Sequence, residues 1–487
     1  MREAGPTPAL QPIVPAYHVR ILSDEQLAQF KSATLEILEE TGIHCPSVKA
    51  REIYASHGAR VNEETQIVRF PPDLVLQAMS SAPRFYTMGA RQHEHDIHLD
   101  GKAFYCATDG CGVETIDFVT RQRRTSCKED IAKMALVSDY LPSVGFYWPI
   151  VSAQDHSTVA PLHELEASYN NTVKHIQTET VMDEQMAAYA VEMASVIAGS
   201  KEALRTRPPL SALICTIAPL AQDRDGMEAA LVLAKEGIPV GFMSMANAGS
   251  TGPATIPGLL AAADAEIVAA LVLLQMAYPG TPVFHSMMPG IMNPRSGAYM
   301  GTTWEIDIAY AIGVELAHMW GVPTLAAVFG PDAQQPGWQS AAEVGSGLLL
   351  NVLCGAETGS GMGLLESCTV LHPEELILAS DIYQRVRITT SRLDTSRDAM
   401  ALDVIKETGP RGQFLRHRHT RDHLHRLQFS GLTSQPSTKE GFQEPVQLAR
   451  EKVDWILANH HPQPLERSQK AEFKRILASA EVKYGTI

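Results

Sequence analysis

The sequence lacks a long uncharged apolar run and an excess of basic residues, and each absence excludes a class of protein. No run of about 18 uncharged apolar residues occurs in the 487 residues, so a membrane span is not expected. The opening MREAGPTPALQP contains no apolar core of the kind that a secretory signal carries. Acidic residues outnumber basic ones by 55 to 40, which disfavours nucleic acid and anionic membranes as partners. We therefore expect a cytoplasmic protein that binds small molecules or other proteins.

Cysteine pairs and the common catalytic motifs are also missing. The seven cysteines are an odd set without CxxC spacing, which predicts reduced thiols and no disulfide framework. No GxSxG, HExxH or GxGxxG occurs, and the glycine-rich GAETGSGMG has no lysine to hold a phosphate. Two groups of histidines remain, and the sequence predicts solvated or structural roles for both, with no metal site: His93, His95 and His98 on an exposed hairpin, and His417, His419, His423 and His425 in a charged tail.

The first hundred residues have the pattern of a helical cap. Ser23 begins an SDEQ capping box with Gln26, an apolar face follows, and Gly42 ends the helix. A weaker helical pattern covers 46–57, and Pro71-Pro72 opens a further short helix. The segment RQHEHDIHLDG then resembles a polar hairpin.

From Ala103 the sequence alternates between short apolar runs and amphipathic segments of helical length. Such alternation predicts a parallel sheet, and about eight units close it into a (β/α)8 TIM barrel over 101–385. An open doubly wound sheet is the alternative, disfavoured because no GxGxxG follows the first strand. The remaining segments are the helical cap at 1–100 and a helical extension at 386–487. The expected strands are 103–108, 145–152, 174–177, 210–216, 239–245, 282–287, 323–328 and 355–360.

Polar residues at the strand ends are the candidates for catalysis, because the loops after the strands form the active face of a parallel barrel. We expect catalytic roles for Asp109, His175, Gln177 and Asn247, and a place for Glu357 in the substrate pocket. Hydrogen bonds within the barrel are the alternative role for all of them. A reactive cysteine thiol is less favoured, since buried cysteines are usually inert.

Aromatic residues near the strands suggest a ligand of one kind. Rings such as Tyr105, Phe329 and Trp338 could enclose a quaternary ammonium, which has no N–H to donate. Arg295, in the loop after the sixth strand, could hold a carboxylate by a bidentate pair, or form a salt bridge to Glu305 or Asp332. Together these features would suit a betaine, which carries a quaternary ammonium at one end and a carboxylate at the other.

Several separated segments carry a family resemblance. They include DEQLAQFKSATLEILEETGIHCPS, YNNTVKH, NAGSTGPATIPGLLAAADAE, the Arg295-Ser296-Gly297 turn, DAQQPGWQSA and ALDVIKETGPRGQFLRHRHT. In order and spacing they resemble the trimethylamine methyltransferase (MttB-like) family. The resemblance implies a barrel that passes a methyl group from an amine to Co(I) of a separate corrinoid protein, with no tightly bound cofactor of its own. It also implies a homo-oligomer.

The sequence departs from the family in the loop that carries pyrrolysine in its founding members. Only Val328, Phe329 and Gly330 lie between the seventh strand and Pro331, and none could act as an imine electrophile. Gln335, Pro336 and Trp338 also differ from the residues usual in the amine enzymes. Members without pyrrolysine resemble glycine betaine methyltransferases or enzymes for related quaternary amines.

The resemblance therefore implies that the methyl donor is a quaternary amine, glycine betaine above all. Carnitine, proline betaine and butyrobetaine are alternatives, as are a folate or thiol acceptor and a betaine sensor without activity. Arg295 would anchor the carboxylate, and Phe329, Trp338 and Tyr105 would surround the cation. Asp109 would add negative potential, while Asn247, Gln177 and His175 would complete the polar lining.

Overall fold

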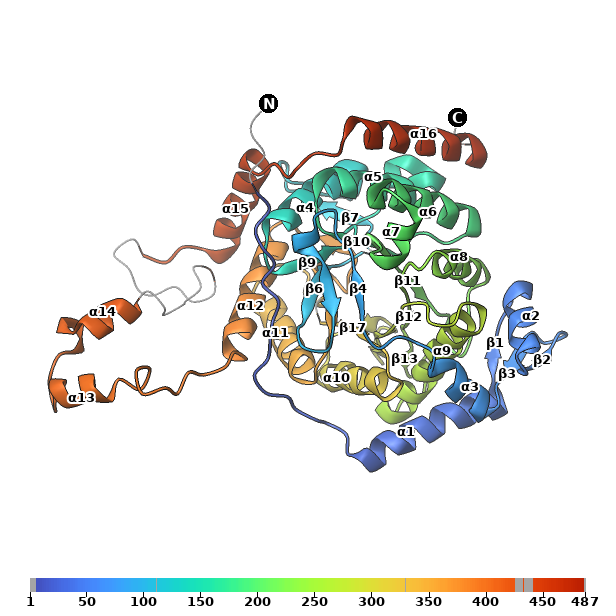
Figure 1. Cartoon of the computed structure of the whole chain (residues 1–487), viewed down its shortest axis with the longest axis horizontal. Helices are drawn as coiled ribbons and strands as arrows, with labels where there is room; N and C mark the ends of the chain where they lie inside the picture. Colours follow the sequence, from blue (N-terminus) through green and yellow to red (C-terminus); the bar gives the residue numbers. More distant parts are fainter. Residues whose placement is uncertain (1–5, 111, 329, 425–431, 433–440, 486–487) are drawn as a thin grey trace.

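The computed structural model describes residues 6–110, 112–328, 330–424, 432 and 441–485 (Figure 1). Its centre is a closed barrel of eight parallel strands with the spatial order β10-β11-β12-β14-β17-β18-β6-β9. The strands are β6 (Tyr105–Thr108), β9 (Val144–Tyr147), β10 (His175–Thr178), β11 (Leu210–Cys215), β12 (Val240–Ser244), β14 (Val283–Met287), β17 (Thr324–Ala327) and β18 (Thr358–Met362). The predicted barrel is confirmed, and every expected strand overlaps one of these eight.

A ring of helices surrounds the barrel, one following each strand. They are α4 (Lys128–Tyr140), α5 (Ala160–Asn171), α6 (Glu184–Ala198), α8 (Arg224–Lys235), α9 (Ile256–Ala277), α10 (Trp304–Met319), α11 (Trp338–Leu353) and α12 (Glu375–Thr389). Helix α9 is long and apolar enough to cross a membrane, but 83% of its apolar window is buried inside the protein. Within α9, Asp264 accepts hydrogen bonds from Thr34 Oγ1 (2.7 Å) and Trp320 Nε1 (2.9 Å), so this helix connects the cap to the barrel.

The N-terminal cap contains strands as well as helices. Helix α1 (Asp24–Glu36) has the predicted capping box at Ser23, and Gly42 adopts a φ of +78° where the π-helical turn Ile37–Thr41 ends. Helices α2 (Val48–Ser56) and α3 (Pro72–Met79) follow, as expected. The purely helical prediction was incomplete because a small sheet of β1 (Ile43–His44), β3 (Ile67–Arg69) and β2 (Arg60–Asn62) lies between them.

A hairpin of β4 (Tyr86–Met88) and β5 (Ile97–Leu99) lies against the N-terminal ends of the barrel strands. The backbone N–H of Gly89 donates to the carbonyl of Pro208 (2.8 Å), and that of Arg91 donates to the carbonyl of Val173 (2.8 Å). The hairpin was expected to be exposed, but His95 is 1% exposed and its Nε2 lies 3.2 Å from the carbonyl oxygen of Pro8. This end of the barrel is therefore covered.

The C-terminal extension has two parts. Helices α15 (Pro445–Asn459) and α16 (Arg467–Tyr484) pack against the outside of the barrel ring, and the expected final helix is α16. Residues 391–424, with α13 (Leu402–Thr408) and α14 (Arg418–Leu424), project away from the body as an arm (Figure 1). The last barrel helix, α12, ends at Thr389, past the boundary expected at residue 385.

Candidate active site

Asp109 and Trp148 lie side by side at the C-terminal end of the barrel, each directly after a strand. Asp109 is 4% exposed, and its Oδ1 accepts a hydrogen bond from the backbone N–H of Gly110 (2.8 Å). The hydroxyl of Thr108 bonds both the N–H and the carbonyl of Trp148 (2.9 and 2.6 Å). A Cβ at Gly110 would lie 1.6 Å from Trp148 Nε1, so the indole packs directly on the Gly110 backbone. An aromatic ring therefore lies next to a buried carboxylate.

Glu179 adds a second carboxyl group to this end of the barrel. It follows β10 directly, and its Oε1 accepts a hydrogen bond from Cys215 Sγ (3.2 Å). Burial raises the pKa of Glu179 to about 7; the hydrogen bond from Cys215 opposes the rise, and the negative charges of Asp109 and Glu164 add to it. Strands β6, β9 and β10 are neighbours in the barrel, so Asp109, Trp148 and Glu179, which directly follow them, lie at the same end of three adjacent strands.

Two amide side chains present polar atoms that lack hydrogen bonds among the described residues. Gln177 lies inside the barrel, is 1% exposed, and receives a long hydrogen bond from Ser211 Oγ (3.4 Å) at its Oε1. Its Nε2 has no partner in the described chain, and the same holds for the buried Oδ1 of Asn247 after β12. Unsatisfied buried polar atoms are costly, so a ligand that bonds them would bind more tightly.

Buried glutamates on the surrounding helices hold the loops of this face in place. Glu266 of α9 accepts hydrogen bonds from Thr216 Oγ1 (2.7 Å), Leu220 N–H (2.8 Å) and Ser244 Oγ (2.8 Å). Glu164 of α5 likewise accepts hydrogen bonds from residues in the loops after β9 and β10. Burial raises the pKa of both carboxyl groups. These two residues position the mouth and are not themselves directed at a ligand.

The short loop after β17 packs closely over Asp109. Gly330 has a φ of +85°, and a Cβ there would lie 2.2 Å from Cys368 Sγ and 3.4 Å from Asp109 Oδ2. Asp332 accepts hydrogen bonds from the N–H groups of Gly301 (3.1 Å) and Thr302 (3.2 Å). Position 330 therefore has no room for a side chain, in keeping with the absence of an electrophilic residue in this loop. Phe329, expected to contact the substrate, lies outside the described residues.

Three of the expected site residues lie at the opposite, N-terminal end of the barrel. Both ring nitrogens of His175 are hydrogen-bonded, to the Gly89 carbonyl (2.7 Å) and Ser211 Oγ (2.9 Å). Glu357 bonds His318 Nε2 (2.9 Å) and the Thr324 N–H (3.1 Å). Tyr105 is the first residue of β6 and is buried near the hairpin. The structure therefore places these three residues at the covered end of the barrel, apart from Asp109.

The remaining two expected residues are exposed. Trp338 begins α11, is 85% exposed, and lines a hollow toward α12 and α15, not the barrel mouth. Arg295 lies in the turn between β15 (Gly290–Met292) and β16 (Tyr299–Met300), and its side chain is exposed. Among the described residues Arg295 forms no ion pair with Glu305 or Asp332, so the alternative role of Arg295 in a salt bridge is not supported.

Glu179 and Cys215 were not among the residues expected at the site, and Trp148 was expected only as one of several aromatic residues near the strands. Each lies directly after or at the end of a barrel strand, so the strand-end rule would have found them with correct strand limits. The expected second strand extended to residue 152 and placed Trp148 in its interior, whereas β9 ends at Tyr147.

The loops around the mouth also expose large apolar side chains. Val113, Met182, Ile217 and Met245 follow β6, β10, β11 and β12 and are 46, 38, 51 and 41% exposed. We call these four residues the apolar rim. Because they lie in loops at the same end of the barrel, these side chains are candidates for contact with another protein.

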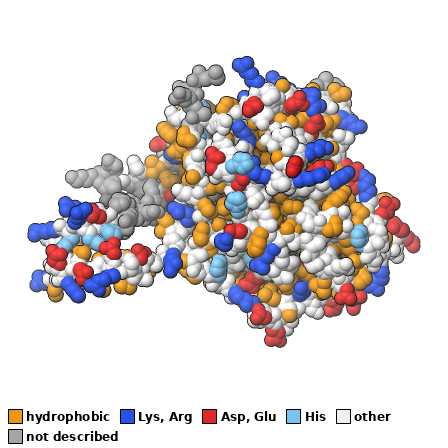
Figure 2. Space-filling model, viewed as in Figure 1, with side chains coloured by type: hydrophobic (Ala, Val, Ile, Leu, Met, Phe, Trp, Pro, Cys, Tyr) orange, Lys and Arg blue, Asp and Glu red, His pale blue; other side chains and the backbone are white. Residues whose placement is uncertain are grey.

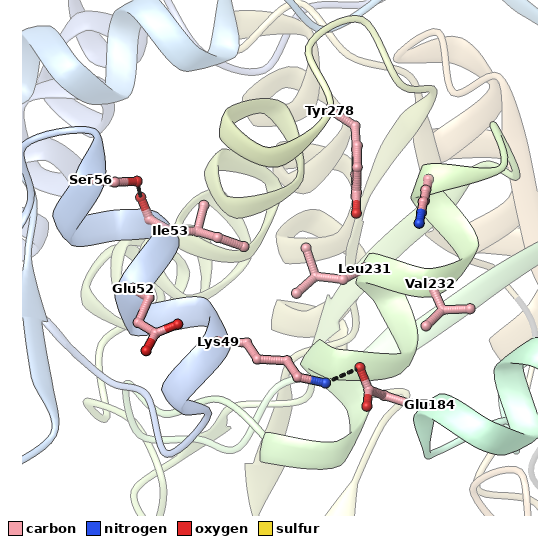
Figure 3. Close-up of a pocket in the computed structure, with 9 residues that line it drawn as sticks. Lys49, Glu52, Ile53, Ser56, Glu184, Leu231, Val232 and Tyr278 are labelled. Atoms are coloured by element: carbon pink, nitrogen blue, oxygen red, sulfur yellow. Dashed lines mark hydrogen bonds and ion pairs between the residues drawn. The ribbon is translucent and has the colours of Figure 1, made fainter.

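A separate hollow lies on the outer wall of the barrel, between α2 and α8 (Figure 3). It encloses about 510 Å³, and an ion pair between Lys49 and Glu184 crosses its edge. Leu231 and Tyr278 form its apolar side. It includes no residue from the ends of the barrel strands, so it is distinct from the candidate site.

A closed (β/α)8 barrel with carboxylates at the carboxyl ends of its strands has the organisation of a barrel enzyme. The chain belongs to the trimethylamine methyltransferase family, whose model matches residues 2–484, and it is a methyltransferase. The trimethylamine methyltransferase MttB of Desulfitobacterium hafniense is 30% identical over 468 residues, covering 95% of this chain and 94% of the relative. A glycine betaine methyltransferase of the same species is 27% identical over 484 residues, with coverage of 97% and 99%.

A solved structure was also matched. The monomethylamine methyltransferase of Methanosarcina barkeri aligns over 96% of this chain and 95% of its own, with 11% identity and a TM-score of 0.48. The strand topology of the chain itself defines the barrel.

Proposed function

We propose that this methyltransferase removes a methyl group from a quaternary amine, glycine betaine, and delivers it to the Co(I) centre of a corrinoid protein, leaving dimethylglycine. The observation that carries the proposal is the placement of Asp109, Glu179 and Trp148 together at the barrel mouth. A glycine betaine methyltransferase among the relatives supports the choice of donor.

The barrel mouth has features that suit a quaternary cation. A trimethylammonium group has no N–H, so hydrogen bonds cannot recognise it, and proteins hold it by aromatic faces and negative charge. Trp148 supplies the ring and the two carboxyl groups supply the charge. A cation between Asp109 and Glu179 would also relieve their mutual repulsion, which stabilises the complex further.

The substrate carboxylate needs a partner of its own. Arg295 is the candidate, because its guanidinium is exposed on the loops of the C-terminal face. The unpaired Nε2 of Gln177 is a second donor inside the barrel. With cation and carboxylate both held, one N-methyl group would be directed outward, toward the mouth.

The reaction is an in-line displacement at carbon. Co(I) of the corrinoid protein would be the nucleophile and would accept the methyl group. As the N–CH3 bond breaks, its electron pair stays on nitrogen, so dimethylglycine leaves with an uncharged amine nitrogen and an unchanged carboxylate, and no proton transfer is needed. The chain contributes orientation of the donor and exclusion of water, the usual sources of rate in such a step.

The remaining assignments follow from this reaction. The apolar rim is the surface on which the corrinoid protein would dock.

A thiol acceptor is less well supported, because burial raises the pKa of Cys106 and Cys215 well above the ordinary value and keeps both protonated. We also propose a cytoplasmic homo-oligomer, in keeping with the acidic composition and the family.

The test is methylcobalamin formation from cob(I)alamin and a panel of amines: glycine betaine, carnitine, proline betaine, butyrobetaine and trimethylamine. We expect turnover with a quaternary amine. Asp109→Asn and Trp148→Leu should each lower kcat/KM by about tenfold or more, since a desolvated cation–π contact alone contributes about 2 kcal/mol. The control is Asp454→Asn, a change at an exposed aspartate on α15. Undiminished activity in both site variants would refute the proposed site, and tight betaine binding without turnover would favour a sensor.

A further inference from the structure

The arm, residues 391–424, is poorly supported by internal packing. Neither α13 nor α14 has a buried side chain, and apolar residues such as Leu393 and Leu415 are 81 and 73% exposed. Segments that cannot bury a core are commonly held by disulfides, metals or partners. The arm contains no cysteine, so a metal or a partner remains as the means of holding it.

Two histidines and an aspartate meet on this arm. His419 and His423 are one helical turn apart on α14, and their rings stack with centroids 4.1 Å apart and an interplanar angle of 18°. Asp398, from the loop before α13, places Oδ2 3.9 Å from His423 Nε2. One ligand atom from each of the three residues lies within 4.8 Å of the others. Figure 2 shows histidines gathered on the projecting arm.

The hydrogen bonds around the two rings prepare them for ligation. His423 Nδ1 is 2.8 Å from the carbonyl oxygen of His419, and His419 Nε2 is 3.1 Å from the carbonyl oxygen of Asp398. A carbonyl oxygen only accepts, so each of these nitrogens carries the proton. The other nitrogen of each ring then has a free lone pair, which is the usual arrangement of metal-binding histidines.

The neighbouring cations have other partners. Arg397 donates to Asp403 (2.7 Å) and Arg418 to Asp422 (3.2 Å). His417, the third histidine described on the arm, is 3.0 Å from Thr408 Oγ1 and lies apart from the group. The carboxylate of Asp398 therefore faces the two stacked imidazoles, not an arginine.

We propose that Asp398, His419 and His423 bind a divalent transition metal ion of the zinc type. Two imidazoles and a carboxylate are a common ligand set for zinc, and they leave one position for water or another ligand. Binding would fasten α14 to the loop before α13 and would supply folding free energy that the arm does not obtain from a core. The sequence alone disfavoured a metal here, because the histidines have neither the HExxH spacing nor a matching set of cysteines.

The test uses the full-length protein after removal of metals with a chelator. Titration with Co2+ should give one equivalent of binding with the visible absorption of a site containing nitrogen ligands, and Zn2+ should displace it. The double variant His419→Asn/His423→Asn should bind Co2+ at least about tenfold more weakly. His93→Asn, at a histidine whose side chain is 82% exposed, is the matched control and should keep wild-type affinity.

Limited trypsin digestion gives a second readout that does not depend on absorption. Zn2+ should slow cleavage at the arginines of the arm in the wild type and in His93→Asn, but not in the double variant. Equal Co2+ affinity in wild type and double variant, or cleavage rates that Zn2+ does not change, would overturn the proposal and leave adventitious metal binding only. These measurements are independent of methyl transfer, because the arm contributes none of the residues of the barrel mouth.

Discussion

Glu179 is the residue through which pH should control this protein. Burial raises the pKa of its carboxyl group to about 7, so at neutral pH it is about half ionised. Lowering the pH protonates it and removes one of the two negative charges at the mouth. We predict that kcat/KM for a quaternary amine falls as the pH drops through about 7, because the cation binds the ionised form.

The measurement is a profile of kcat/KM against pH between about 5.5 and 8.5, which reports groups of the free enzyme. Glu179→Gln should have a lower kcat/KM at pH 8 and should lose the inflection near 7. A profile in that variant that keeps the wild-type inflection would assign the titration to another group.

Some of the expected residues lie at the barrel mouth and others do not. Asp109 and Asn247 lie there because each comes shortly after its strand, so the strand-end rule placed them without knowledge of the exact strand limits. His175 and Glu357 were selected from inside the expected third and eighth strands, and the structure places them at or just before the start of β10 and β18, at the covered end. The strand-end rule concerns only the carboxyl ends of the strands, so it gave no reason to place these two residues at the mouth.

At the scale of elements, the loops of the mouth depend on single glutamates of the outer helices. Glu266 accepts three hydrogen bonds, from the loop after β11 and the end of β12. Glu266→Ala would leave those donors unpaired, and we predict a loss of about 2–4 kcal/mol in the free energy of unfolding. Urea denaturation measures it. The exposed Glu52 provides the control, and Glu52→Ala should change stability by about 0.5 kcal/mol or less. Equal stability of Glu266→Ala and Glu52→Ala would show that the loops do not depend on the hydrogen bonds to Glu266.

The order of the elements was predictable because apolar runs of strand length alternate with helical periods, and Gly-x-Pro separates several of them. The three-stranded sheet of the cap was not predicted, since its strands have only two or three residues. So short a segment carries no measurable period, and its pairing depends on packing against the rest of the cap.

At the scale of the whole molecule, the apolar rim predicts where the partner protein binds. Ile217→Asp and Met245→Asp place a charge on that face, and we expect each to weaken binding of the corrinoid protein by about tenfold or more. Binding of glycine betaine alone should not change. Surface plasmon resonance measures the first quantity and calorimetry the second.

The control is Val48→Asp, because Val48 is 55% exposed on the distant helix α2. If that variant weakened docking as much as the rim variants, the partner would bind elsewhere. If none of the three variants had an effect, apolar contacts on the rim would not contribute to the complex.

The hairpin β4–β5 has a consequence for the order of events. It covers the N-terminal end of the barrel, where His175 and Gly89 join the two parts. The proposed reaction therefore uses the opposite, C-terminal mouth both for entry of the amine and for docking of the acceptor protein. We predict that the amine binds before the acceptor covers this mouth, and that the demethylated product leaves after the acceptor departs. The reaction would then follow an ordered sequence in which the donor binds first and its product is released last.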